Sequence, residues 1–142
     1  MPIWIGNQNF DNWSKVLDWL NINEETTIIA HSIAPIFVCK YLIIRKIKVK
    51  KLIFVCWFND YFSGNNEYDT VNETMYTKDL SNIKEYCNNI VCYYSDNDPY
   101  VDIENEKYFT KIVANKYYII KGWWHINIES GYNKFPEILK EI

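Results

Sequence analysis

Hydrophobic residues along the chain follow two spacings, one typical of amphipathic helices and the other of buried strands. Apolar residues three and four positions apart predict helices at Asp11–Leu20, at Ile33–Ile44, after an N-cap at Asp102, and from Phe135 to Ile142. Short runs rich in β-branched and aromatic residues predict strands at Thr26–His31, Lys51–Cys56, Asn89–Tyr94 and Lys116–Ile120. The consecutive apolar positions of the first run indicate a strand that is buried on both faces.

Helices and strands alternate along the whole chain, without an internal repeat or a linker. This order predicts an α/β fold in a single domain over residues 1–142, a three-layer αβα sandwich around a mostly parallel sheet of about four strands. Right-handed crossovers would bring the carboxyl ends of the strands to one edge of the sheet, where ligands bind in such folds. The segment Trp57–Asp79 fits the alternation least. We expect a long loop there with at most a helical turn or two, as in many lids and binding loops.

Composition and charge exclude several classes of protein. The net charge is −3 and the pI about 5.4, so no basic field indicates a nucleic-acid partner. The basic run Arg45–Lys51 is interpreted as a solvated connecting loop. No apolar stretch reaches the roughly 18 residues of a membrane span, and the first residues do not resemble a signal peptide. We therefore expect a soluble, cytoplasmic protein without a membrane partner.

The cysteines give no indication of a metal site. The chain has 4 cysteines, and no two of them form a C-x-x-C pair. A structural zinc site requires paired ligands, and only 2 histidines are present. We interpret Cys39, Cys56, Cys87 and Cys92 as buried, reduced thiols, and we expect no bound metal.

Three polar residues follow predicted strands in an order that indicates hydrolytic chemistry. Ser32 comes after the first strand, Asp98 after the third and His125 after the fourth. Each has an ordinary structural explanation, since Ser32 could be a helix N-cap, Asp98 an Asx-turn residue before a proline, and His125 a packed loop histidine. Together they have the Ser, Asp, His order of α/β-hydrolases, in which histidine is the general base and aspartate holds its tautomer.

The residues around Ser32 are compatible with a tight turn between strand and helix. Such a turn needs small residues two positions before and after the serine, usually in the pattern G-x-S-x-G, and here Ala30 and Ala34 stand in place of the glycines. We expect Trp57 and Trp124, which lie close to predicted strand ends, as possible residues of a substrate pocket. Most of the other tryptophans should lie in the core.

Three stretches of the sequence carry a family resemblance, which runs from about Asn7 to the C-terminus. They are I-A-H-S-I-A, Y-S-D-N-D-P-Y-V and H-I-N-I-E-S-G-Y-x-x-F-P. In these the chain resembles the retinoblastoma-binding protein 9 and YdeN-like family of small serine hydrolases. The resemblance implies an α/β-hydrolase fold with Ser32 as nucleophile, His125 as base and Asp98 as acid, and it implies no cofactor. Asp98 is preferred to Asp96 because Val101 stands three residues after it, as in hydrolases.

The sequence also departs from this family. Before the segment that matches Pro2–Trp4, family members have a β-α-β unit that this chain lacks, so we expect a truncated hydrolase fold. The missing turn normally supplies one backbone donor of the oxyanion hole, and the other would be the N–H of Ile33. The strand Thr26–His31 would become a bare edge, which favours association into a homo-oligomer. Trp124 also replaces a small residue, usually glycine, and could crowd the site.

Two functional hypotheses follow from these observations. The first is a serine hydrolase that cleaves an ester, thioester or amide in a small-molecule acyl substrate. The alternative is a catalytically impaired, N-terminally truncated hydrolase-fold protein that acts as a binding or interaction module. A fragment of a longer gene product is a further interpretation.

Overall fold

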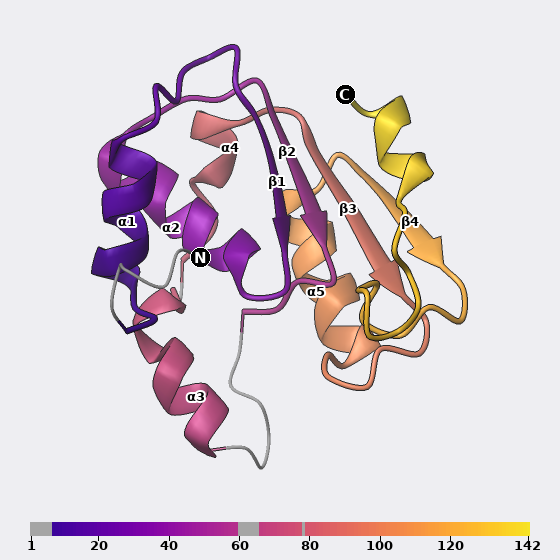
Figure 1. Cartoon of the computed structure of the whole chain (residues 1–142). Coiled ribbons are helices and arrows are strands. Elements are labelled where there is room, and N and C mark those ends of the chain that lie inside the picture. The colour runs from indigo at the N-terminus through magenta and orange to yellow at the C-terminus, as the bar shows by residue number, and fades with distance from the viewer. Residues whose placement is uncertain (1–6, 60–65, 78) are drawn as a thin grey trace.

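The computed structural model describes residues 7–59, 66–77 and 79–142 (Figure 1). Its centre is a parallel sheet of four strands in the order β1-β2-β3-β4. The strands are β1 (Thr27–His31), β2 (Lys51–Val55), β3 (Ile90–Ser95) and β4 (Lys116–Ile120). The α/β class and the parallel sheet predicted from the sequence are therefore confirmed, each strand within one residue of its expected bounds.

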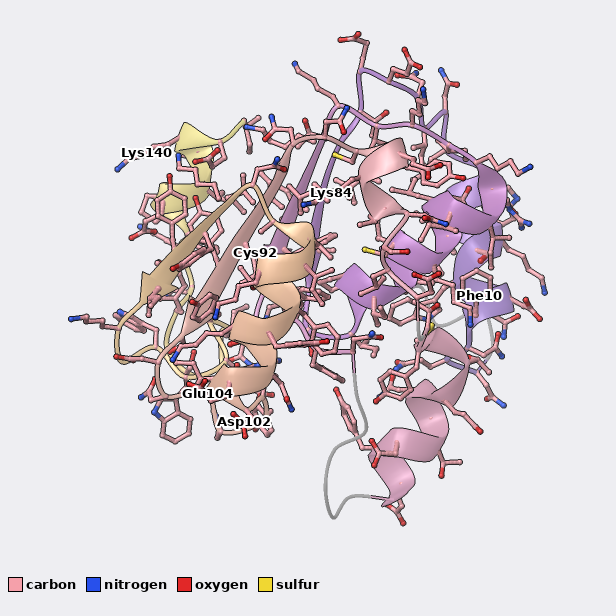
Figure 2. All side chains as sticks on the ribbon, turned by 180° about the vertical axis from the view of Figure 1, so that it is seen from behind. Phe10, Lys84, Cys92, Asp102, Glu104 and Lys140 are labelled. Atoms are coloured by element: carbon pink, nitrogen blue, oxygen red, sulfur yellow. The ribbon has the colours of Figure 1, made fainter. Side chains whose placement is uncertain are left out.

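The helices that the 3.6-residue spacing predicts before β1, after β1 and after Asp102 are confirmed, and side chains cap the first and the last of these at their N-termini. The described α-helices are α1 (Phe10–Asp18), α2 (Ala34–Arg45), α3 (Asn66–Asn72), α4 (Ile83–Tyr86) and α5 (Ile103–Val113), with 3₁₀ helices η2 (Glu73–Met75) and η3 (Pro136–Lys140). Asp102 caps α5 as predicted, its side chain accepting a bond from the N–H of Glu104, and both residues lie at the start of that helix in Figure 2. The segment 57–79 contains α3 and η2, somewhat more helix than expected.

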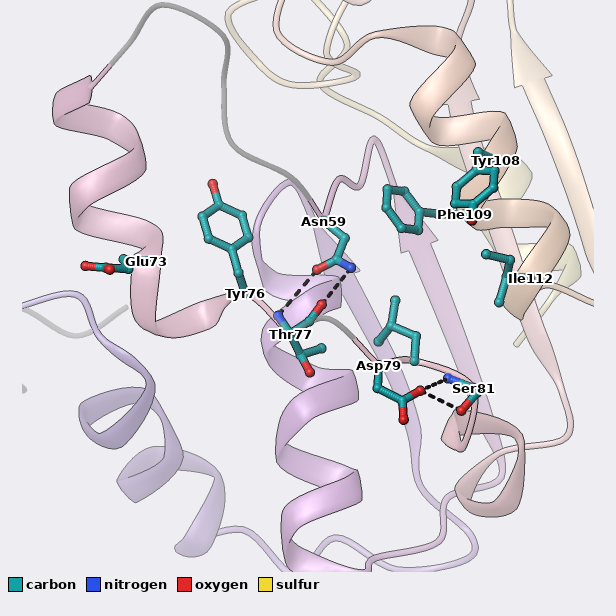
Figure 3. A pocket seen from close by; sticks show the side chains of 10 residues that line it. Asn59, Glu73, Tyr76, Thr77, Asp79, Ser81, Tyr108, Phe109 and Ile112 are labelled. Carbon is teal, nitrogen blue, oxygen red and sulfur yellow. Dashed lines mark hydrogen bonds between the residues drawn. The ribbon is translucent and has the colours of Figure 1, made fainter.

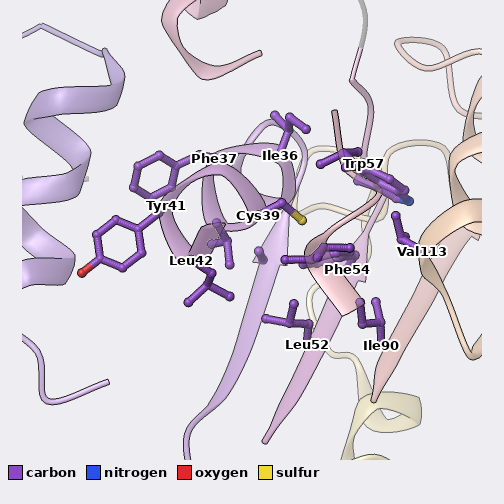
Figure 4. Close-up of a cluster of buried hydrophobic side chains, with 14 of the residues drawn as sticks. Ile36, Phe37, Cys39, Tyr41, Leu42, Leu52, Phe54, Trp57, Ile90 and Val113 are labelled. Carbon is purple, nitrogen blue, oxygen red and sulfur yellow. The ribbon is translucent and has the colours of Figure 1, made fainter. Parts of the chain in front are cut away.

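The two faces of the sheet are covered by different layers. Alternate strand residues such as Leu52, Phe54 and Ile90 face α1, α2, α4 and α5 and form the larger core, part of which Figure 4 shows. The other face carries Ile53, Val55 and Val91, which pack against the C-terminal part of the chain, including η3. The helices α1, α2, α4 and α5 thus share one face, while the third layer is a 3₁₀ helix with its preceding loop.

Two expectations about burial are wrong for a geometric reason. The strand β1 was expected to be buried on both faces, but it lies at the edge of the sheet and Ile29 is 50% exposed. The C-terminal apolar stripe was expected to pack as an α-helix, but η3 buries Ile138 and leaves Leu139 70% exposed, and Ile142 beyond its end is also 70% exposed. A 3₁₀ helix repeats every three residues, so the α-helical stripe does not stay on one side.

The parallel register determines where the functional chemistry can lie. His31 pairs with Val55, Val55 pairs with Tyr93, and Ser95 pairs with Ile120, so the four strands end at one edge of the sheet. The loops that follow β1, β3 and β4 therefore meet there. All four cysteines are buried free thiols, as predicted, and no helix in the described part of the chain has the length and apolar character needed to cross a membrane.

Candidate active site

Ser32 lies on a sharp turn between β1 and α2. Its φ is 62°, in the left-handed region that residues other than glycine, asparagine and aspartate seldom adopt. Its N–H donates to the carbonyl of Val55 at 3.0 Å, which ties the turn to the neighbouring strand. Ala30 and Ala34 have taken the places of the usual glycines without preventing this turn. The conformation therefore projects the hydroxyl from the edge of the sheet beside the positive end of α2.

Asp98 is held in the loop after β3 by bonds to both of its carboxylate oxygens. Its Oδ1 accepts from the N–H groups of Tyr100 at 2.8 Å and Val101 at 3.1 Å, and its Oδ2 accepts from His125. The side chain of Asp98 has no solvent exposure. Asp98 is therefore both an Asx-turn residue, through Oδ1, and the partner of the histidine, through Oδ2. Asp96 instead accepts from the N–H of Gly122 and is exposed, so the geometry favours Asp98.

His125 connects the other two side chains. Its Nδ1–H donates to Asp98 Oδ2 at 2.7 Å, and its Nε2 lies 3.0 Å from Ser32 Oγ. The imidazole is buried, with 7% exposure of the residue. Because the carboxylate can only accept, the proton of the neutral ring belongs on Nδ1, which leaves the Nε2 lone pair directed at the serine hydroxyl.

The backbone around His125 is unusual on both sides. Trp124 and Ile126 have φ values of 45° and 47°, both in the left-handed region. The side-chain oxygen of Asn97 accepts from the N–H of Trp124 at 2.9 Å, and the Ile126 N–H donates to the carbonyl of Trp123 at 2.8 Å. The loop after β3 therefore supplies both the partner of the histidine and an anchor for its backbone.

Ile33 has the position of an oxyanion donor. It follows Ser32 directly, precedes the first turn of α2 and is 6% exposed. Within residues 7–59, 66–77 and 79–142, its N–H makes no backbone hydrogen bond. An N–H at the start of a helix that makes no such bond can donate to a negatively charged oxygen beside the serine.

A cavity of about 420 Å³ opens over Ser32 and His125. Its described lining combines aromatic and polar side chains. They are His31, Ser32, Phe58, Tyr68, Tyr100, His125, Asn127 and Glu129. Neither tryptophan that we expected in the pocket belongs to this lining. Trp57 is fully buried between Phe54 and Phe109 in the main core, and Trp124 is 56% exposed.

Several of these lining residues were missed in the sequence, although signals for them existed. Tyr100 packs edge-on against the His125 ring, with centroids 5.1 Å apart, and it belongs to the stretch S-D-N-D-P-Y-V. Asn127 and Glu129 belong to H-I-N-I-E-S-G. His31 directly precedes the candidate nucleophile. The distinctive stretches thus contain wall residues of the cavity as well as the three polar groups.

Glu106 is a second carboxyl behind the three side chains. It lies near the start of α5, where acidic residues commonly face solvent, but it is completely buried and neither oxygen has a hydrogen-bond partner among the described residues. Burial, with a smaller contribution from the charge of Asp98, raises the pKa of Glu106 to about 9. The carboxyl of Glu106 is therefore protonated at neutral pH.

Cys56 lies close to other potential metal ligands, but the hydrogen bonds and the protonation of these groups disfavour a metal site. Donor atoms of His31, Cys56 and His125 lie within 4.8 Å of one another, and so do those of Cys56, Asp98 and Glu106. His125 is engaged with Ser32 and Asp98, and burial raises the pKa of the Cys56 thiol, which disfavours the thiolate that binds metals. The arrangement fits proton transfer better than metal binding.

A second, larger cavity lies away from this chemistry. Its volume is about 660 Å³, and it lies between residues 73–77 and 79–81 on one side and Tyr108, Phe109 and Ile112 of α5 on the other (Figure 3). Asn59 bridges one side by donating to the carbonyl of Thr77 at 2.8 Å. None of the three candidate catalytic side chains lines this cavity. Cavity volume alone therefore does not identify the active site of this protein.

Comparison with known proteins agrees with the geometry. A model of the serine hydrolase family matches residues 6–142, almost the whole chain. The chain belongs to the serine hydrolase family. The resemblance seen in the three sequence stretches is thus confirmed at the level of the family. No curated protein sequence matches the chain significantly.

Several solved structures share the fold of this chain. The ydeN gene product of B. subtilis matches with a TM-score of 0.79 at 17% identity, over 94% of this chain and 73% of that one. The monoacylglycerol lipase of Paleococcus ferrophilus matches with a TM-score of 0.60 at 11% identity, over 96% and 72%. Est1E from Butyrivibrio proteoclasticus matches with a TM-score of 0.61 at 15% identity, over 94% and 67%. These identities establish a shared fold.

Proposed function

We propose that this serine hydrolase cleaves an ester, thioester or amide bond with Ser32 as nucleophile, His125 as general base and acid, and Asp98 as its charge partner. The observation that carries the proposal is the unbroken chain of bonds from Ser32 Oγ through His125 to Asp98, at 3.0 and 2.7 Å. A hydroxyl next to a base that is itself oriented by a third group is the arrangement of an activated nucleophile.

The geometry supports each proton transfer of such a reaction. Ser32 Oγ attacks the substrate carbonyl while His125 Nε2 takes the hydroxyl proton, and Asp98 stabilises the imidazolium that forms. The tetrahedral intermediate places its oxyanion near the Ile33 N–H. His125 then protonates the leaving alcohol, thiol or amine, and an acyl group remains on Ser32. A water molecule then attacks the acyl carbon while His125 Nε2 takes its proton. The bond between the acyl carbon and Ser32 Oγ breaks, His125 returns the proton to Oγ, and the carboxylic acid leaves.

The cavity limits the substrate by size. Its volume of about 420 Å³ lies near the lower end of the range of small-molecule sites, which is roughly 300–1,000 Å³. Phe58, Tyr68 and Tyr100 offer apolar surface for the body of a substrate, while Asn127 offers an amide to its polar groups. We therefore propose a small acyl substrate, in the absence of any cofactor.

A fluorophosphonate probe tests the proposal directly, because it phosphonylates an activated serine and ignores an ordinary hydroxyl. We expect stoichiometric labelling, with the modified peptide containing Ser32, and no labelling of Ser32→Ala. Ser130, whose hydroxyl donates to the carbonyl of Asn127 within a turn, is the built-in control for non-specific reaction. A folded protein that the probe does not label at Ser32 would refute the enzyme and favour the alternative of a hydrolase-fold binding module.

A further inference from the structure

His31 connects the turn of the nucleophile to the backbone of the base. Its Nε2 lies 2.8 Å from the carbonyl oxygen of His125, and the two rings lie 4.7 Å apart. A carbonyl can only accept, so His31 Nε2 carries the proton and donates it. His31 is also the residue directly before Ser32, so this bond joins the two loops whose separation sets the distance between nucleophile and base.

The segment that bears His125 needs such a support. Its neighbours Trp124 and Ile126 are both left-handed, a conformation that is strained for such residues and persists only where surrounding bonds impose it. Asp96 and Asn97 anchor this segment to the loop after β3 through Gly122 and Trp124. Those anchors fix His125 relative to Asp98, but they do not connect it to β1. The bond from His31 makes this connection.

The protonation state of His31 suits its bond to the His125 carbonyl. Burial lowers the pKa of His31, so the ring is neutral at neutral pH. A neutral donor can hold the carbonyl of His125 without placing a second positive charge beside the imidazolium that catalysis requires. A lysine or arginine in the same place would make that bond at the expense of the imidazolium.

We propose that His31 is a positioning residue, which holds His125 at hydrogen-bonding distance from Ser32 through its bond to the His125 carbonyl. This inference rests on the proposed function for its kinetic consequence, but the bond itself can be tested without catalysis. Without the hydrogen bond from His31, the His125 imidazole can move relative to the Ser32 hydroxyl. A displacement of about 1 Å can cost roughly 100-fold in rate. The substrate contacts elsewhere in the cavity remain, so the effect should fall on kcat.

Two substitutions distinguish the contribution of the His31 ring from that of its N–H donor. His31→Phe keeps an aromatic ring and removes the N–H, whereas His31→Gln removes the ring and places an amide N–H near the former Nε2. We expect kcat for ester hydrolysis to fall roughly 10- to 100-fold in His31→Phe with KM within about 3-fold, and to recover most of this loss in His31→Gln. His31→Met provides a second variant without a donor, should His31→Phe fold poorly.

A measurement that does not depend on turnover completes the design. The downfield proton resonance of His125 Nδ1–H, bonded to Asp98, should be sharp in the unmodified protein and in His31→Gln, and broadened in His31→Phe and His31→Met. Equal kcat values and equal resonances in all variants would overturn the inference, as would a loss in His31→Gln as large as in His31→Phe. If the unmodified protein neither hydrolyses esters nor reacts with the probe, the proposed function fails, and the resonances alone decide whether His31 holds His125.

Discussion

Replacing Asp98 with asparagine should lower kcat for hydrolysis of an unactivated ester by about 10⁴-fold while the protein keeps its fold. The oxygen of the introduced amide can still accept from the N–H groups of Tyr100 and Val101, so the turn survives. The amide nitrogen would then face His125 Nδ1 as a donor. This forces the imidazole proton onto Nε2, where the lone pair that should accept the proton of Ser32 is lost.

Asp96 offers a matched control two residues away. It is exposed and accepts from the N–H of Gly122, and asparagine can accept the same bond. We expect Asp96→Asn to change kcat by less than about 3-fold, an effect within the range of surface substitutions. The assay is initial-rate hydrolysis with acid release followed at constant pH. Equal losses in the two variants, or an Asp98→Asn protein with near-normal kcat, would show that Asp98 is not the partner of His125.

The second large effect concerns stability and involves Glu106. Its pKa is about 9 in the folded protein, against an ordinary value of 4.5, because burial and the nearby Asp98 disfavour its charge. We expect Glu106→Gln to have a higher free energy of unfolding than the unmodified protein at neutral pH, by roughly 3 kcal/mol. The glutamine is neutral in both the folded and the unfolded chain, so it avoids the cost of holding a proton on the buried carboxyl.

The direction of the pH dependence follows from the raised pKa. Below about pH 4.5, the carboxyl is protonated in both states and contributes no penalty. Between pH 4.5 and 9, the unfolded chain gains by releasing the proton while the folded chain retains it, so stability falls by about 1.4 kcal/mol per pH unit. The advantage of Glu106→Gln should therefore be least near pH 4.5 and grow as the pH rises.

Denaturant unfolding at a series of pH values measures this difference. Glu104 is the control, because it lies on the same turn of α5 with a side chain that is 75% exposed, so Glu104→Gln should leave the slope with pH unchanged. A constant difference between Glu106→Gln and the unmodified protein from pH 5 to 8 would contradict the buried, protonated state. The slope is the decisive quantity, because a buried amide adds a pH-independent cost of its own.

The sequence predicted the site better than it predicted the surroundings of the site. Ser32, Asp98 and His125 could be located because the carboxyl ends of parallel strands converge, so three polar residues after three strands must lie near one another. Trp57 could not be assigned in the same way. A tryptophan after a strand can point into the core or toward the cavity, and the packing of Phe54 and Phe109 decided for the core.

Glu106 shows the same limit for charged residues. Its place in the first turn of a helix is favourable for a carboxylate according to the helix dipole, and Glu104 follows that rule. The rotation of α5 against the sheet turned the next acidic residue inward instead. Local propensity sets where a helix begins, whereas the face that it buries depends on partners distant in sequence.

Self-association and the cellular compartment remain predictions from the sequence. The structure places β1 at the edge of the described sheet with Ile29 half exposed, which is compatible with pairing to a second copy.

By itself, the sequence determined the class of fold, the strand order along the chain and the three side chains of the candidate triad, because hydrophobic periodicity and strand ends are local features. Only the tertiary structure decided that His31 supports the base, that Glu106 keeps its proton and that Phe58 replaces Trp57 in the cavity wall. Each of those outcomes depends on distances between segments far apart in the chain, which packing alone sets.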